Sequence, residues 1–353
     1  MIKKIEKKVK NTERLTLDDC LFLFNSDDIF SIGRLADFKA KQLHSGKVYY
    51  SRNRHVNPTN LCVNRCKFCS FSRSIGQDGG FDYTVSHIID MLKTSGDYFR
   101  ELHIVGGLHP HHPFEYYVQL LKQIKLTFPH VSIKAFTAVE IDYMSKLNGL
   151  GVTQTLETLK SAGLDMLPGG GAEIFSSSVR DALCPEKIPA EVWLHIHEAA
   201  HTLGIRSNAT MLYGHIESFE DRVRHMTLLR DLQDKTGGFF AFIPLAYQPE
   251  GKIAGTATPS AIDDLKTIAI SRLFLDNFSH IKAYWIMLGR KVTQTALLFG
   301  ADDIDGTVIQ EKIAHSAGAK SPERLTVSEI EFLIKKAGKI PVERTALYRE
   351  VTQ

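Results

Sequence analysis

Residues 58–73, PTNLCVNRCKFCSFSR, place three cysteines, Cys62, Cys66 and Cys69, in a C-x3-C-x2-C spacing, with no fourth cysteine close by. A cubane iron–sulfur cluster is normally held by four cysteine thiolates. Three ligands in one short loop leave one iron open, and an open coordination position separates catalytic metal sites from closed ones. The spacing therefore predicts a [4Fe–4S] cluster whose open iron binds a small chelating molecule and passes an electron to it.

Two other interpretations of the three cysteines are a zinc knuckle that borrows a nearby histidine, such as His55, and three unrelated thiols. Zinc knuckles usually come as paired C-x2-C units. This chain has five cysteines, and the other two, Cys20 and Cys184, are far apart in the sequence and form no second pair. We interpret those two as ordinary thiols.

Composition limits the class of protein. The chain has 353 residues, 43% of them apolar and 24% charged, with a formal net charge of +3. These values are typical of a globular protein in water, and nothing in them demands nucleic acid or an anionic membrane as a partner. The charged N-terminus lacks the apolar core of a secretory signal. Few cysteines and an oxygen-sensitive cluster together favour the cytoplasm.

Short apolar runs alternate with amphipathic stretches of helical length along most of the chain. We expect strands at 55–61, 101–106, 131–138, 164–167, 205–213, 239–246 and 281–287. We expect helices at 84–98, 113–127, 152–162, 189–203, 219–235 and 259–277. This alternation predicts an α/β fold, a full or partial (β/α) TIM-type barrel. Residues 1–50 are expected to form a helical N-terminal extension, 51–300 the barrel core, and 301–353 a mostly helical C-terminal extension.

Polar or glycine-rich segments follow nearly every expected strand, and in a barrel such segments share the face where active sites form. Gly106 and Gly107 expose backbone to a ligand, or else form a tight turn. Glu140 lies in an expected loop, where its carboxylate could accept hydrogen bonds from two hydroxyl groups of a ligand. The alternative is a charged side chain in solvent. Gly169, Gly170 and Gly171, followed by Glu173, predict a nest for a carboxylate, or else a flexible turn.

Other motifs carry weaker signals. Residues 197–201, HEAAH, match the H-E-x-x-H zinc-protease pattern, but Ser207 stands where the extended pattern needs its third histidine. We expect that helix to pack outside the barrel. His109, His111 and His112 resemble a metal tract, although a rim loop explains them more simply. Polar residues at the ends of later strands, among them Tyr213, His215 and Tyr247, are candidates for orienting a substrate.

The cysteine motif, with the aromatic Phe68 just before its last cysteine, resembles the signature of the radical S-adenosylmethionine (SAM) superfamily. The resemblance implies that the open iron binds the methionine part of SAM and that reduction releases a 5′-deoxyadenosyl radical. It also implies that the loop at Gly106–Gly107 binds the amino group of SAM and that Glu140 binds its ribose. Phe68, Ser72 and His109 complete the expected SAM site.

The stretch from about 50 to 300 resembles the menaquinone and deazaflavin branch of that superfamily, through the phrases GGLHP, LPGGGAEIF, RSNATMLYGHIE and FIPLAYQPEG. Within the branch it is most similar to members that form aminofutalosine. The resemblance implies that the adenosyl radical adds to the enol ether of 3-[(1-carboxyvinyl)oxy]benzoate, so that SAM is a co-substrate. Members that abstract hydrogen, and a non-catalytic iron–sulfur or zinc protein, are the alternatives.

That reaction needs groups that bind two carboxylates and a one-electron donor such as flavodoxin or ferredoxin. By position and chemistry, His215, Tyr213 and Arg206 are the catalytic candidates. The candidates for binding the aromatic substrate are Gly169, Gly170, Gly171, Glu173 and Tyr247.

Overall fold

In the computed structural model of the chain, seven parallel strands form one curled sheet in the order β2-β3-β4-β5-β6-β7-β8. The structure describes residues 1–351 except 95, 97, 249–252, 254–255 and 257. The strands are β2 (Asn53–Val56), β3 (Glu101–Ile104), β4 (Ser132–Ala135), β5 (Met166–Leu167), β6 (Arg206–Tyr213), β7 (Phe239–Ala246) and β8 (His280–Ile281). The predicted α/β barrel fold is confirmed, as a partial barrel.

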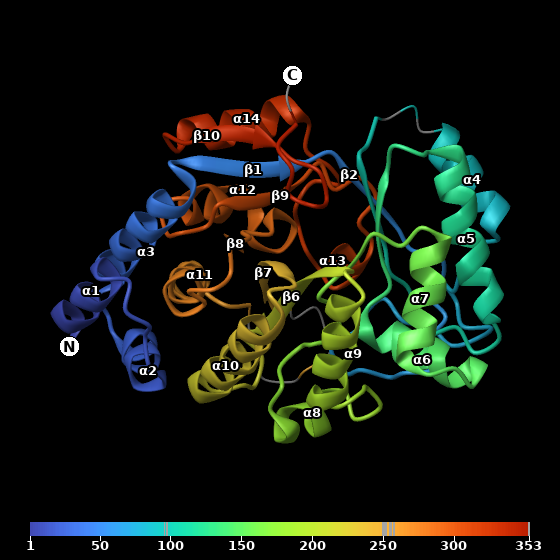
Figure 1. Cartoon of the computed structure of the whole chain (residues 1–353), viewed down its shortest axis with the longest axis horizontal. Coiled ribbons are helices and arrows are strands. Elements are labelled where there is room, and N and C mark those ends of the chain that lie inside the picture. The colour runs from blue at the N-terminus through green and yellow to red at the C-terminus, as the bar shows by residue number, and fades with distance from the viewer. Residues whose placement is uncertain (95, 97, 249–252, 254–255, 257, 352–353) are drawn as a thin grey trace.

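Helices surround the curled sheet (Figure 1). Those that follow its strands are α4 (Val85–Thr94), α5 (Phe114–Thr127), α6 (Ala138–Asn148), α7 (Val152–Ala162), α8 (Ser177–Leu183), α9 (Ala190–Thr202), α10 (Phe219–Thr236), α11 (Ala261–Phe274) and α12 (Trp285–Ala296). At the N-terminus, α1 (Ile2–Lys10) precedes α2 (Leu17–Asn25) and α3 (Ile29–His44), which pack on α10 and α11. No helix among the described residues is long and apolar enough to cross a membrane.

The two ends of the chain meet in a second, three-stranded sheet with the order β10-β1-β9. It joins β1 (Lys47–Ser51) to β9 (Asp303–Gly306) and β10 (Ile340–Glu343). From β9 the chain runs between the two edge strands of the curled sheet. Isolated parallel β-bridges join the backbone of Asp303 to that of Lys282, and the backbone of Ile309 to that of Arg54. The C-terminal part, which also contains α13 (Ile313–Ser316) and α14 (Val327–Lys336), therefore covers the open side of the barrel.

Several expected boundaries differ from the observed ones. Residues 281–287 were expected to be one strand, but β8 ends at Ile281 and α12 begins at Trp285. The helical extension expected over 1–50 contains β1 from Lys47 onward. Residues 95 and 97 of the expected helix 84–98, and Glu250 in the phrase FIPLAYQPEG, lie outside the described residues. The division into three parts stays a prediction.

A buried network of charges lies at the junction of the two sheets. Lys134 pairs with Glu101, which also accepts from Arg344 at 3.2 Å. Arg344 donates to Asp303 at 2.6 Å, and Lys282 pairs with Asp305. Each of these side chains is at least 95% buried. Buried charges persist only when they are paired. The network therefore ties β3 and β4 of the curled sheet, and the residue after β8, to β9 and to the residue after β10.

Candidate functional site

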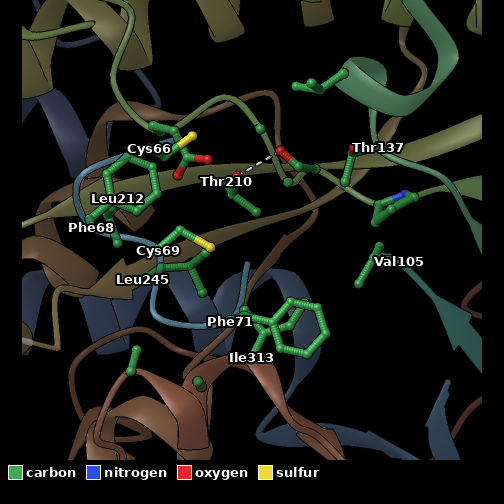
Figure 2. Close-up of a pocket in the computed structure, with 18 of the residues that line it drawn as sticks. Cys66, Phe68, Cys69, Phe71, Val105, Thr137, Thr210, Leu212, Leu245 and Ile313 are labelled. Atoms are coloured by element: carbon green, nitrogen blue, oxygen red, sulfur yellow. Dashed lines mark hydrogen bonds between the residues drawn. The ribbon is translucent and has the colours of Figure 1, made fainter. Parts of the chain in front are cut away.

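A cavity of about 320 Å³ opens inside the curled sheet, on the side of the strand carboxyl ends. Side chains point inward at every second strand residue. Asn208, Thr210 and Leu212 of β6 therefore line the cavity, as do Ile243 and Leu245 of β7. In Figure 2, Cys66 and Cys69 lie on one side of this space, opposite Thr137 and Val105. The predicted convergence of loops on one mouth agrees with this arrangement.

All three cysteines of the motif line the cavity. Backbone bonds shape their loop: the Cys62 N–H donates to the Arg73 carbonyl at 3.0 Å, and the Cys69 N–H to the Cys66 carbonyl at 3.0 Å. The loop is also tied to the end of α8, where the Lys67 N–H donates to the Leu183 carbonyl at 2.8 Å. These bonds turn the three thiols toward one space.

The three thiols do not form a compact tetrahedral site for a single ion. Zinc–sulfur bonds of about 2.3 Å place tetrahedral thiolate ligands within about 4 Å of one another. Among the described residues, two groups of three ligands have all their ligand atoms within 4.8 Å, and the three cysteines are not one of them. Burial raises the pKa of the Cys66 thiol to about 12 and also raises that of Cys62. Thiolates at this site therefore need a bound metal centre to stabilise them.

The glycine pair packs against the cysteine loop. A Cβ at Gly107 would lie 2.2 Å from the Leu61 carbonyl oxygen, so only glycine allows this approach. The Gly107 N–H donates to the Thr59 carbonyl at 2.9 Å. Both glycines line the cavity. Neither glycine has a positive φ, so a turn that needs glycine does not explain the pair. The close approach of the two loops does explain why glycine is required at position 107.

Glu140 lies in the first turn of α6 and not in a loop, as the sequence had suggested. Its carboxylate accepts from the Gly106 N–H at 3.0 Å and from the N–H and hydroxyl of Thr137 at 2.7 and 2.8 Å. Thr137 and Glu140 thus form a capping box. Burial is the largest influence on this carboxyl and raises its pKa to about 7. Glu140 still lines the cavity, beside the bare backbone of the glycine pair.

The glycine-rich turn at 169–171 forms the wall between β5 and β6. Gly169 lies so close to β6 that a Cβ would be 2.8 Å from the Asn208 carbonyl oxygen, and its own carbonyl accepts from the Thr210 hydroxyl at 2.6 Å. Glu173 forms an ion pair with Lys187, whose ammonium lies 5.2 Å from the centre of the Phe68 ring. The turn, both charged side chains and the ring all line the cavity.

Comparisons with known proteins agree with this geometry. Residues 56–229 match the radical SAM superfamily, and residues 236–353 match the CofH/MqnC C-terminal region. The chain is 45% identical to aminodeoxyfutalosine synthase of Thermus thermophilus, over 98% of this chain and 95% of the relative. It is 41% identical to the enzyme of that name from Streptomyces coelicolor, over 98% and 93%. The chain belongs to the aminodeoxyfutalosine synthase family of radical SAM enzymes.

More distant relatives share the fold. A 5-amino-6-(D-ribitylamino)uracil–L-tyrosine 4-hydroxyphenyl transferase of Methanococcoides burtonii is 36% identical over 95% of this chain and 96% of the relative. The solved structure of methylornithine synthase superposes with a TM-score of 0.77 at 17% identity, covering 96% of this chain and 97% of that one. A FeFe-hydrogenase maturase from Carboxydothermus hydrogenoformans gives 0.76 at 17% identity, covering 99% and 80%. At such identities these two structures support the fold alone.

The structure places most residues of the predicted SAM site of this radical SAM enzyme at the cavity, but not all of them. Phe68 and Ser72 line the cavity with the glycine pair and Glu140, but His109 does not. The His109 Nδ1 accepts from the backbone N–H groups of His111 and His112, at 3.1 and 3.0 Å. Its Nε2 therefore carries the proton in the neutral ring and faces Asp82 at 3.5 Å. Asp82, His109 and His112 are one of the two groups of three whose ligand atoms lie within 4.8 Å of one another. With its proton on Nε2, however, the neutral His109 ring has no free nitrogen for a metal, so we interpret the tract as loop structure.

The structure does not bring the three predicted catalytic residues to the cavity. Arg206 is exposed at the amino end of β6, away from the rim, and donates to the Gly237 carbonyl. Tyr213 points outward and donates to Asp264 of α11 at 2.7 Å. The imidazole of His215 is buried against Glu217, 2.9 Å away. Direct contact with a substrate in the cavity would require these side chains to leave their present partners.

The zinc-protease motif lies on α9, outside the barrel, as expected. His197 Nδ1 and His201 Nε2 lie 2.9 and 2.7 Å from the hydroxyl of Ser207. Ser207 is the residue that stands in place of the third histidine. Glu198, which would be the catalytic base of a protease, pairs with Lys235 at 2.6 Å. The motif therefore joins α9 to β6 and α10.

Several residues that line the cavity were not predicted to do so, and His55 was named only as a possible zinc ligand. His55, His103 and Lys134 form one inward layer, because β2, β3 and β4 pair in register at these positions. Strand alternation could have identified His103 and Asn208, since each occupies one of the alternate strand positions whose side chains face the barrel interior. Lys187 follows α8 in a turn, and no local pattern distinguishes it.

Proposed function

We propose that the chain joins the 5′-deoxyadenosyl group of SAM to 3-[(1-carboxyvinyl)oxy]benzoate and forms 6-amino-6-deoxyfutalosine in menaquinone biosynthesis. The observation that carries this proposal is the 45% identity with a relative of matching name over 98% of the chain. The cavity supports it, because the cysteine motif, the glycine pair and Glu140 share one apolar space. Loss of the enol carboxylate carbon accompanies the joining step.

In this proposal, Cys62, Cys66 and Cys69 hold the [4Fe–4S] cluster. When bound, the cluster supplies the electron that cleaves SAM to methionine and the adenosyl radical. The backbone at Gly106–Gly107 and the carboxyl group of Glu140 position SAM. Val105, Leu212, Ile243 and Leu245 supply apolar walls that keep water away from a reactive intermediate.

The glycine turn at 169–171, with Glu173 and Tyr247, is proposed to contact the substrate. Each of these residues lines the same cavity. Glu173 forms an ion pair with Lys187. Because both side chains line the cavity, the pair presents an ammonium group and a carboxylate side by side to the ligands. A flavodoxin or ferredoxin as electron donor and a cytoplasmic location complete the proposal.

Product mass analysis tests this function. The enzyme, reconstituted with iron and sulfide under anaerobic conditions, is given SAM, a chemical reductant and the enol-ether benzoate. We expect one product that contains both the adenosyl group and the aromatic ring, and we expect no such product from a Cys69→Ser variant.

Two results would contradict the proposal. Release of 5′-deoxyadenosine and methionine, without an adenosylated product, would indicate a hydrogen-abstracting member of the branch. Product formation from tyrosine and 5-amino-6-(D-ribitylamino)uracil in place of the benzoate would instead assign the activity named for the Methanococcoides burtonii relative.

A further inference from the structure

Within the part of the chain that the structure describes, four buried polar atoms of residues that line the cavity have no hydrogen-bond partner. They are His55 Nε2, His103 Nε2, Asn208 Oδ1 and Tyr247 Oη. Buried polar groups in native proteins are nearly always hydrogen-bonded, so each exception needs an explanation. Four such atoms around one cavity indicate a polar ligand that supplies the missing partners.

The two histidines form a pair. His55 and His103 are paired in register on β2 and β3, and their ring centres are 4.6 Å apart. They lie deeper than the loops: Gly106 comes three residues after His103, roughly 10 Å farther toward the mouth at strand spacing. The pair therefore lies toward the floor of the cavity, below the cysteine loop.

The charged groups near this floor are already paired with one another. Lys134, in register with His103, pairs with Glu101, and Asp305 pairs with Lys282. Burial lowers the pKa of both histidines, so each is a neutral imidazole with one N–H to donate. Glu311, the carboxylate with the largest charge effect on His55, pairs with His315 at 3.3 Å. An anion that enters this end of the cavity thus meets two buried Nε2 atoms without a partner among the described residues, and each can donate in the tautomer that carries its proton there.

We propose that His55 and His103 bind the ring carboxylate of the substrate. This inference rests on the proposed function. The enol-ether double bond must face the cysteine and glycine loops, where SAM binds. The ring carboxylate lies at the other end of the molecule and therefore reaches the floor. Asn208 Oδ1 is a hydrogen-bond acceptor and cannot bind a carboxylate. It would instead accept a hydrogen bond from a hydroxyl or amino group of SAM or of the substrate.

The test compares two compounds: 3-[(1-carboxyvinyl)oxy]benzoate and 2-phenoxyacrylate, which lacks only the ring carboxylate. Hydrogen bonds to a charged group are the strong ones. We expect the wild-type enzyme to prefer the benzoate by at least tenfold in kcat/KM. His55→Leu and His103→Leu should each reduce that preference at least fivefold, mainly through the KM of the benzoate, and His103→Gln should restore part of it.

His197→Leu is the matched control, because its Nε2 atom is likewise buried and without a partner among the described residues, but the residue lies on α9, away from the cavity. It should keep the wild-type preference. Equal loss of activity toward both compounds in the His55 and His103 variants would overturn the proposal, and so would a wild-type enzyme that does not distinguish them. The wild-type comparison of the two compounds does not depend on whether the variants fold. Absence of an adenosylated product from the benzoate with wild-type enzyme would instead refute the proposed function itself.

Discussion

Gly107 is the point where the glycine loop touches the cysteine loop. A Cβ there would lie 2.2 Å from the Leu61 carbonyl oxygen and 2.7 Å from its carbon, which are backbone atoms one residue before Cys62. The missing side chain at Gly107 therefore lets the two loops pack closely, and this contact fixes the backbone next to Cys62, which we propose as a cluster ligand.

Gly107→Ala should displace the cysteine loop. Overpacking typically costs about 1–3 kcal/mol, and here the strain falls on backbone next to Cys62. We expect iron bound per chain after reconstitution to fall to less than half of the wild-type value, with a parallel loss of product. Gly151→Ala is the control, because a Cβ at Gly151 meets nothing within 4 Å. Full iron content in Gly107→Ala would contradict the argument.

Glu140 should make stability depend on pH. Its pKa is raised by burial to about 7 from the ordinary value of 4.5, so the folded state binds the proton more tightly than the unfolded state. Stability from this group is present at low pH and is lost as pH rises from 4.5 through 7. The expected loss is about 3 kcal/mol.

Urea unfolding of wild-type protein and Glu140→Gln between pH 4.5 and 8 measures this effect. The difference in unfolding free energy between wild type and variant should fall by about that amount up to pH 7 and then level off. A difference that is constant across the range would show that the three hydrogen bonds to the carboxylate outweigh its burial.

At the scale of elements, the position of a helix in the barrel decides what its motif does. Helix α9 follows the turn at 169–171 and precedes β6, so it packs on the outer face of the sheet. His197 and His201 both face Ser207, and Trp193 stacks on His197 with ring centres 3.8 Å apart. The histidines are part of the packing between helix and sheet.

Glu198→Gln therefore should change little. The side chain is on the outer surface, where an ion pair contributes at most about 1 kcal/mol. We expect product formation within twofold of wild type and a thermal midpoint within about 4 °C, the largest shift that about 1 kcal/mol gives in a domain of this kind. A loss of activity greater than tenfold would mean that α9 has a chemical role.

At the scale of the whole molecule, the chain closes its own cavity. The segment after β9 runs between β8 and β2, and Glu311, Ile313 and Ala314 line the cavity from that side. The N-terminal strand β1 holds β9 and β10 in place. Residues from both ends of the chain are thus needed to complete the site.

Lys282→Met tests this closure through the buried charge network. It would leave Asp305 without its cation, and removing one partner of a buried pair costs about 3–5 kcal/mol. Urea unfolding should show a loss of that size. Lys335→Met is the control, because Lys335 pairs with Glu331 on the surface of α14 and its side chain is 61% exposed. Similar losses in both variants would contradict the structural role of the network.

Much of this protein was predictable because its signals are local. Three cysteines within eight residues specify a cluster loop, since ligand spacing depends only on the adjacent chain. The alternation of strands and helices predicts the parallel barrel, because each βα unit buries its own apolar face. Boundaries such as the start of α12 at Trp285 were missed because an apolar run of this length suits strand and buried helix equally.

The tertiary structure decided the rest. A polar residue after a strand can face the cavity or its surroundings, and a one-residue difference reverses its direction. Tyr213 turned outward for this reason, whereas Asn208 turned inward. His215 follows the strand and is held by Glu217 in the next loop. The layer of His55, His103 and Lys134 exists only through strand register, and the covering of the barrel by residues 303–314 only through long-range pairing. Local sequence patterns were enough for the fold class and for the prediction of a cluster loop, because both depend on neighbouring residues. Which side chains face the cavity depended on packing between distant parts of the chain.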